Sequence, residues 1–348
     1  MAVYPRSFHR PFFATGPDLI ETESNSMSLA ARLKSSIGSM GRVVVGLSAA
    51  AALLAGAPGV RAQEAGHDHA HSAPAAVVPA TGAGPALWVV KDEDSTIYLF
   101  GTVHVLRPDT PWGSAKVDAA FDASDELILE FANPDDQAAL VPIFRQHGVS
   151  PERPLSSLLT AEELADLDTA ARTVGGTAAG MDSLRPWLAA VTLAVAPLVR
   201  AGYDPQSGVE RLLKARALEA HKEVGGFETA DQQIRIIAGL SEETQLDLLR
   251  STLKEFDEAL TGVDELVSAW ASGDEAAIDR LAVVEMRDAS EEIYQALLVR
   301  RNGNWADQIE TLLQGSGTTF IAVGSAHLAG EDSVQSMLEA RGLEVERQ

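Results

Sequence analysis

Two short apolar segments at opposite ends of the chain run into the same pattern, and this pairing restricts the fold more than any other feature. Residues 98–104 read YLFGTVH and residues 321–327 read IAVGSAH, so each apolar run leads to a glycine and then a histidine. Glycine permits a sharp turn at the end of a strand. Ligands of α/β sheets bind at the carboxyl ends of strands. We therefore expect one sheet that contains strands from both ends of the chain. The side chains of His104 and His327 would then point into the same cleft.

The remaining pattern adds strands at both ends and helices between them. Alternation at 88–91 and 96–100, with turn residues between, predicts a β-hairpin. From about residue 155 to residue 314 the apolar spacing is mostly helical. Further elements are expected at 114–123 (helix), 126–131 (strand), 223–227 (strand), 318–323 (strand), 332–340 (helix) and 343–346 (strand). The predicted fold class is α/β, with a central sheet built from N- and C-terminal strands of the mature chain and a large helical insertion.

Two helices of this insertion can be predicted in more detail. Ser241 is expected to cap a helix with one apolar face. That face would comprise Leu246, Leu249, Leu253, Phe256 and Leu260. Residues 187–199 are very apolar, but about thirteen residues with Pro197 inside them are too few for a membrane span. We expect this segment to be one buried core helix.

Charge and cysteine content exclude several classes of protein. The chain has 27 Lys and Arg against 50 Asp and Glu, a net charge of −23. Such an acidic surface argues against nucleic acid and anionic membranes as partners. The chain has no cysteine, so disulfides, thiolate metal sites and cysteine nucleophiles are excluded.

The N-terminal region is typical of an export signal followed by a linker. Residues 1–62 contain basic residues, then a short apolar run at 43–54, and then small residues of the kind found at a signal-peptidase cleavage site. They are therefore predicted to be a secretory signal peptide. Met27 or Met40 would be better starts for such a signal. Residues 63–86 are rich in Ala, Pro, Gly and His and predict a flexible linker before a domain at 87–348.

These features predict an exported protein, periplasmic or secreted, with no stable membrane anchor after signal cleavage. An uncleaved anchor is the alternative for the first segment. The histidines of the linker, His67, His69 and His71, could hold Zn²⁺ or Cu²⁺ loosely, although a solvated tail is the simpler interpretation.

A carboxylate near the end of a third strand completes a possible metal site. Glu130 lies near the carboxyl end of the strand predicted at 126–131. Two histidines and one carboxylate are a common ligand set for Zn²⁺, Mn²⁺ or Fe²⁺. Glu130 could ligate the ion or take a proton from water. The alternative is that His104 and His327 are hydrogen-bonded structural residues.

From Trp88 onward the sequence resembles the TraB/GumN family, which is related to the Tiki membrane peptidases. The motifs that carry the resemblance are Leu99–His104, Ser124–Glu130, Gly202–Pro205, Gly208–Glu210, Glu228–Gln233, Ala269–Asp274, Arg301–Ala306 and Ala322–Gly330. The family pattern of two G-x-x-H motifs, a Glu and an Arg maps onto His104, His327, Glu130 and Arg301. The resemblance implies a divalent-metal site, with Mn²⁺ or Co²⁺ associated with the Tiki members, and peptide-bond hydrolysis. Glu210 and Ser325 depart from the family pattern without removing a proposed ligand.

Other polar residues near these motifs have competing interpretations. Arg301 would stabilise an oxyanion or bind a substrate carboxylate, or else pair with a structural acid. Glu210 and Glu228 are expected to be solvated helix carboxylates, with support of the histidines as the alternative. Asn302 and Trp305 are expected to pack within a helix or to support the site.

The sequence therefore predicts a metal-dependent hydrolase that acts on a peptide or protein substrate. His104, His327 and Glu130 would bind a divalent ion (Mn²⁺, Co²⁺ or Zn²⁺), and Glu130 and Arg301 would be the catalytic residues. No H-E-x-x-H motif is present, so a metallopeptidase of this sequence is not a zincin. The rival is a non-catalytic protein that sequesters peptides in the same cleft.

Overall fold

The computed structural model describes residues 77–348, except 135 and 257–258. Its main sheet has six strands in the order β6-β5-β7-β3-β2-β8. These strands are β2 (Leu87–Lys91), β3 (Ser95–Thr102), β5 (Glu126–Phe131), β6 (Glu223–Glu228), β7 (Gly317–Gly324) and β8 (Val345–Arg347). The predicted signal peptide, both alternative starts and the His67–His71 tract lie outside the described residues.

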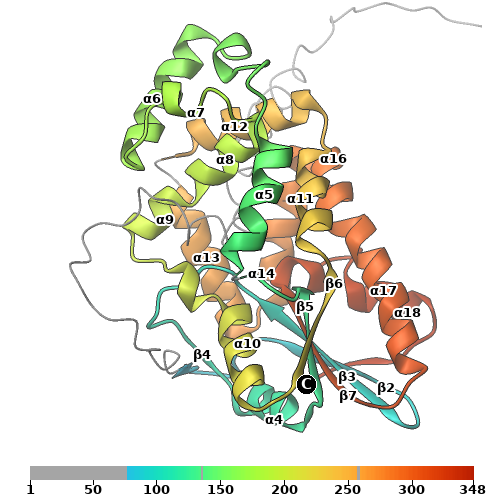
Figure 1. The fold of residues 1–348 in the computed structure, drawn as a ribbon. Helices are drawn as coiled ribbons and strands as arrows, with labels where there is room; N and C mark the ends of the chain where they lie inside the picture. Colours follow the sequence, from blue (N-terminus) through green and yellow to red (C-terminus); the bar gives the residue numbers. More distant parts are fainter. Residues whose placement is uncertain (1–76, 135, 257–258) are drawn as a thin grey trace, which may run out of the picture.

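The sheet confirms the expected α/β class and the contribution of both chain ends. β2 and β3 form the predicted antiparallel hairpin, and β8 extends it on the other side of β2. β3 pairs in parallel with β7, and β7 pairs in parallel with β5. Strands from opposite ends of the sequence thus lie side by side at the centre of the sheet (Figure 1).

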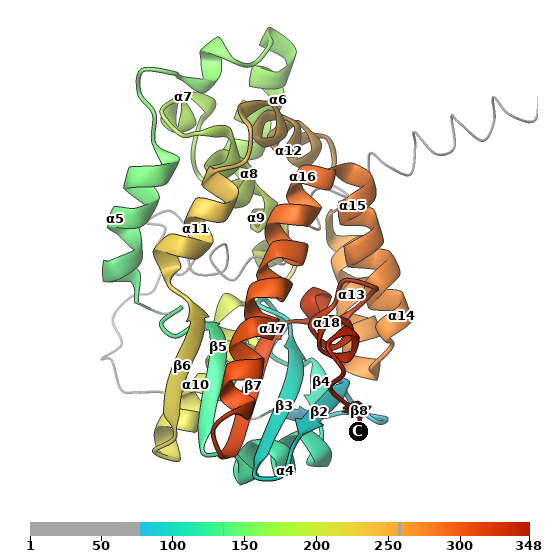
Figure 2. The same cartoon turned by 90° about the vertical axis from the view of Figure 1, so that its right-hand side faces the viewer.

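Residue alternation along the strands divides the core into two layers. Phe100 and Phe320 belong to the larger apolar cluster, which includes Phe121 of helix α4. Leu99 and Ile321, one position away, belong to the second cluster with residues of α17 and α18. Figure 2 shows α17 crossing one face of the sheet, with α10 on the opposite side.

Most of the helices extend beyond the carboxyl ends of the parallel strands (Figure 1). The α-helices are α4 (Ala115–Ala123), α5 (Gln137–Gly148), α6 (Ala161–Thr173), α7 (Ala178–Met181), α8 (Pro186–Ala194), α9 (Ala196–Arg200), α10 (Val209–Glu219), α11 (Ala230–Ala238), α12 (Glu242–Lys254), α13 (Ala259–Ser272), α14 (Glu275–Ile278), α15 (Glu285–Ala289), α16 (Glu291–Tyr294), α17 (Arg300–Leu313) and α18 (Val334–Ala340). Short helical turns and π-helical segments join them: η1 (Leu155–Ser157), η2 (Pro205–Ser207), η3 (Asp279–Val284), η4 (Gln295–Val299) and η5 (Ser325–Leu328). No helix within the described part of the chain is long and apolar enough to cross a membrane.

Two of the helix predictions were wrong in extent. The segment 187–199 is buried as expected, but it is split at Val195 into α8 and α9. Pro197 supplies no backbone N–H, so one continuous helix would lose a hydrogen bond there. Ser241 caps α12 by accepting a hydrogen bond from the Thr244 backbone N–H, but this helix ends at Lys254. Its fully buried positions are Gln245, Leu248, Leu249 and Thr252, while Leu246 and Leu253 of the predicted face are partly buried against the core.

The last ten residues of the predicted linker pack on the domain. Strand β1 (Val78–Pro79) pairs in parallel with β4 (Pro111–Gly113). Ala86 is buried beside the second apolar cluster. The folded unit therefore includes residues before position 87, because the two-residue ladder with β4 and the buried Ala86 hold them against the domain.

Candidate functional site

Three strand ends and one helix bring the predicted site residues together. His104 follows β3, Glu130 is the penultimate residue of β5, and His327 lies in η5 directly after β7. Arg301, in the first turn of α17, reaches into the same cluster. All four side chains are buried, with no more than 3% of the residue surface exposed.

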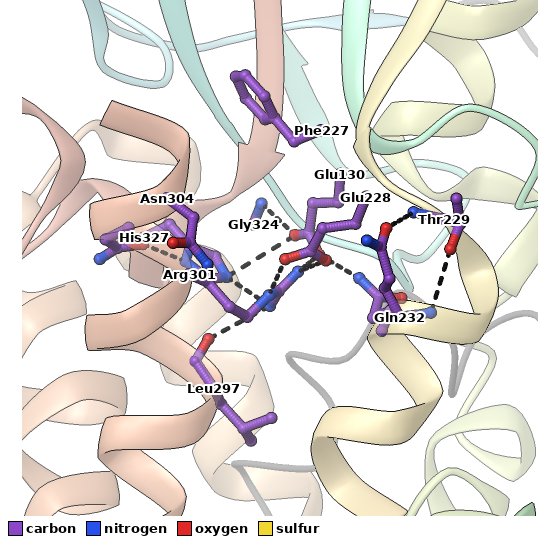
Figure 3. Close-up of polar contacts among 12 residues, drawn as sticks. Glu130, Phe227, Glu228, Thr229, Gln232, Leu297, Arg301, Asn304, Gly324 and His327 are labelled. Atoms are coloured by element: carbon purple, nitrogen blue, oxygen red, sulfur yellow. Dashed lines mark hydrogen bonds and ion pairs between the residues drawn. The ribbon is translucent and has the colours of Figure 1, made fainter. Parts of the chain in front are cut away.

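The Glu130 carboxylate lies at the centre of this cluster (Figure 3). Its Oε1 atom lies 3.7 Å from His104 Nε2 and 4.0 Å from His327 Nε2, and it accepts the Gly324 backbone N–H at 2.8 Å. Its Oε2 atom accepts hydrogen bonds from Arg301 at 2.7 Å and from Gln233 at 2.8 Å. One carboxylate thus connects the ends of three strands.

Hydrogen bonds on the other ring nitrogen orient each imidazole. His104 Nδ1 lies 2.9 Å from Glu210 Oε1, and His327 Nδ1 lies 2.6 Å from Asn302 Oδ1. These oxygens accept hydrogen bonds, so we assign a proton to the Nδ1 atom of each ring. The Nε2 lone pair of His327 then accepts a hydrogen bond from Arg301 Nη1 at 3.0 Å. A hydrogen bond at Nδ1 is how a metal-binding histidine is commonly held.

Arg301 supplies the compensating positive charge. Its Nε and Nη2 atoms donate to both carboxylate oxygens of Glu228 at 2.8 Å, while Nη1 lies 3.0 Å from His327 Nε2. Burial tends to lower the pKa of Arg301, but the two glutamates outweigh burial and raise it. The guanidinium is also 4.6 Å from the ring centroid of Trp305, which lies 4.4 Å from the His327 ring.

Burial and charge act in opposite directions on the two central titratable groups. Burial raises the pKa of Glu130, but Arg301 and the two histidines outweigh it and hold that pKa far below its usual range. For His327, burial and then the Arg301 charge lower the pKa to about 3. At neutral pH the cluster therefore holds an ionised Glu130 and a neutral His327, the protonation states that metal ligation requires.

The chemistry of the donor set fits a divalent ion. Two imidazole nitrogens and a carboxylate oxygen converge beside Gly324, where an added Cβ would lie 3.1 Å from Glu130 Oε1 and 3.3 Å from His104 Nε2. Among residues 77–348, leaving aside 135 and 257–258, no group of three such side chains is already positioned to hold an ion. In the described positions, Arg301 lies against the nitrogen of His327 that a metal would use.

The expectation that Glu210 and Glu228 are solvated helix carboxylates was wrong. Glu210 lies on α10 but is buried against His104, and Glu228 ends strand β6, where it binds Arg301. Gln233, which donates to Glu130, is also buried; the sequence placed it in a motif of the resemblance but gave it no role. These roles depend on strand order, which spacing along the chain does not reveal.

Asn302 and Trp305 both support His327, as one of the sequence interpretations suggested. Asn302 bonds its ring and Trp305 packs against it. Because these residues lie on α17 with Arg301, that single helix positions both the cation and one imidazole of the cluster.

Gly208 provides a first test of how closely these elements approach one another. An added Cβ at Gly208 would lie 2.4 Å from the His104 carbonyl oxygen, so Gly208→Ala must displace backbone. We expect the variant to lose about 1–3 kcal/mol of unfolding free energy in denaturant titration. Gly303→Ala is the control, because its Cβ would meet no atom within 4 Å, and helix propensity predicts a gain of up to about 1 kcal/mol. Equal stability of the two variants would contradict this packing.

Comparison with known proteins gives one family and two similar relatives. A model described as the TraB/PrgY/gumN family matches residues 86–347. The protein named Uncharacterized protein YbaP of Escherichia coli (strain K12) is 23% identical over 256 residues, 73% of this chain and 92% of that protein. The protein of the same name from Shigella flexneri gives the same identity and coverage. No solved structure matches the chain.

Proposed function

The chain belongs to the TraB/PrgY/gumN family, and from this premise we propose that it is an exported, metal-dependent hydrolase that cleaves peptide bonds. The observation that carries the proposal is the approach of two imidazole Nε2 atoms, from His104 and His327, to one oxygen of Glu130. Three strand ends supply this donor set at the edge of the sheet where α/β proteins bind ligands.

His104, His327 and Glu130 would hold the ion. A divalent ion at this position would polarise the scissile carbonyl and lower the pKa of the attacking water. The low pKa of Glu130 favours its role as a ligand over a role as proton acceptor, because a strongly acidic carboxyl is a weak general base. Arg301 would orient Glu130 and place positive charge where a tetrahedral oxyanion develops.

Glu210 and Asn302 act on the imidazoles from outside the donor set. Each bonds an Nδ1 atom, so each fixes a ring orientation and leaves Nε2 as the ring nitrogen that lies near Glu130 Oε1. Mn²⁺, Co²⁺ and Zn²⁺ are the candidate ions. Export is part of the proposal and rests on the composition of residues 1–62.

A second candidate function is sequestration of a peptide without catalysis. The observation that favours it is the complete set of bonds around Arg301, which joins Glu130, Glu228 and His327 in one buried cluster. Such a cluster can be purely structural. A stoichiometric complex from which the peptide is recovered intact would favour this candidate.

The deciding experiment measures bound metal and peptide cleavage together. We expect near-stoichiometric Mn²⁺, Co²⁺ or Zn²⁺, by elemental mass spectrometry, in the untagged protein incubated with each ion. The double variant His104→Ala/His327→Ala should bind no metal and should not cleave a peptide library that the unsubstituted protein cleaves. His147→Ala is the matched control, since His147 lies on α5, bonded to Asp231. Equal cleavage by the double variant and the unsubstituted protein would refute the assignment.

A further inference from the structure

A basic pocket adjoins the buried cluster and is not used by the chemistry described above. It has a volume of about 730 Å³, in the size range of ligand sites. Its lining includes Phe227, Glu228, Arg235, Arg300, Arg301 and Trp305. Strand β6 and helices α11 and α17 contribute these residues, and Figure 3 draws Phe227, Glu228, Arg301 and Asn304 of the lining as sticks.

The charge of this pocket is opposite to that of the chain. Three arginines and one glutamate line it, whereas the whole chain carries a net charge of −23. Glu228 is already bonded to Arg301 through both carboxylate oxygens. The other two arginines therefore leave a positive potential that a small anionic group would neutralise.

Arg300 and Arg235 differ from Arg301 in their availability. Arg301 is buried and fully engaged, but Arg300 is exposed, and its charge is one of the causes that lower the pKa of the Glu292 carboxyl. Arg235 pairs with Asp231 in a solvent-exposed i,i+4 contact, which is a weak interaction. A guanidinium binds a carboxylate through two parallel hydrogen bonds, so both arginines suit a carboxylate ligand.

The remaining walls suit a peptide rather than a bare anion. Phe227 stacks on Trp305 with ring centroids 5.3 Å apart and an interplanar angle of 18°. Ile236 and Ala296 add apolar surface, while the side-chain amides of Gln232, Asn304 and Gln308 can bond a peptide backbone. Arg301 lines the pocket and also donates to Glu130, so it connects the pocket to the buried cluster.

We propose that this pocket binds a carboxylate of the peptide substrate through Arg300 and Arg235. The proposal rests on the proposed peptidase function, and it sets the substrate class as peptides with a carboxylate near the scissile bond. The overall acidity of the chain would by itself favour cationic peptides, so the local charge of the pocket makes the opposite prediction. The carboxylate is either the C-terminal one or that of an Asp or Glu side chain.

Calorimetric titration in EDTA tests binding separately from cleavage. The probes are four unlabelled octapeptides that combine a C-terminal acid or amide with an internal Glu or Gln. We expect the unsubstituted protein to prefer a carboxylate-bearing peptide over the amide/Gln peptide by about tenfold or more. The two intermediate peptides show which carboxylate is recognised. Equal affinity for all four peptides would overturn the proposal.

Arginine variants then locate the site. Arg300→Gln and Arg235→Gln should each reduce the preference, and together they should abolish it, while binding of the amide/Gln peptide stays unchanged. Arg172→Gln is the matched control, because Arg172 is also exposed and paired at i,i+4, with Asp168, but lies on α6 away from the pocket. A preference that survives the double substitution would overturn the assignment. Peptides that bind with this preference but are cleaved with none of the three ions would refute the hydrolase and leave the pocket standing.

Discussion

Replacement of Arg301 by methionine is expected to destabilise the protein by about 3–5 kcal/mol, because it leaves buried carboxylates without their cation. Arg301 is 3% exposed and is the ion-pair partner of Glu130, which is also 3% exposed, and of Glu228. Methionine fills much of the volume of the arginine side chain. The loss of unfolding free energy therefore measures the missing charge more than a change in packing. Urea titration at pH 7.5 in EDTA measures the difference.

The neighbouring arginine is the matched control for this variant. Arg300→Met lies on the same helix but at an exposed position, and we expect a change within about 0.5 kcal/mol. Arg301→Lys should fall between the two, since it keeps the charge but cannot bond Glu228 through two parallel N–H groups. A loss below about 1 kcal/mol for Arg301→Met would show that the cluster is accessible to water or already neutral.

The neutral state of His327 predicts a loss of stability in mild acid. Its folded pKa of about 3 lies below the ordinary value of 6.5, so the unfolded chain binds more protons between these pH values. The stabilisation is present above about pH 6.5 and is lost as the pH falls toward 3. Between pH 7.5 and 4.5, His327 alone should account for about 2–3 kcal/mol of lost unfolding free energy in EDTA.

A pair of His→Asn variants isolates this contribution. Between pH 7.5 and pH 4.5, His327→Asn should lose about 2–3 kcal/mol less unfolding free energy than the unsubstituted protein. This difference does not depend on how stable the variant is at pH 7.5. His221→Asn is the control, because His221 is exposed and its positive φ of 57° is one that asparagine tolerates. If the His327 variant keeps the full pH dependence, other groups carry the acid sensitivity, and His327 is not held neutral by burial.

Local sequence patterns predicted the strands well because each is a short apolar run bounded by turn residues. The hairpin at 88–100, the strand at 126–131 and the strand at 318–323 all occur where their residues predict them. Helix limits were less predictable. Apolar periodicity continued past Lys254, and the effect of Pro197 depends on what packs around it.

The sequence by itself determined which residue types meet at the candidate site. The pattern of strands places a glycine and a histidine at the ends of β3 and β7, and Glu130 near the end of β5. Ligands of α/β sheets bind at these carboxyl ends, so the sequence alone indicated that these residues form a site. The resemblance added Arg301 to this set. In these respects the chemistry is local and can be recognised from spacing.

Only the tertiary structure decided the partners of these residues. Glu228 reaches Arg301 because the parallel order of β6, β5, β7 and β3 aligns their carboxyl ends, and Glu210 reaches His104 from the first turn of α10. Nothing in the sequence distinguishes a buried acidic partner from a solvated one among the 50 acidic residues of the chain. Burial and charge are properties of the assembled sheet and helices, so the pKa values and the basic pocket follow from the fold alone.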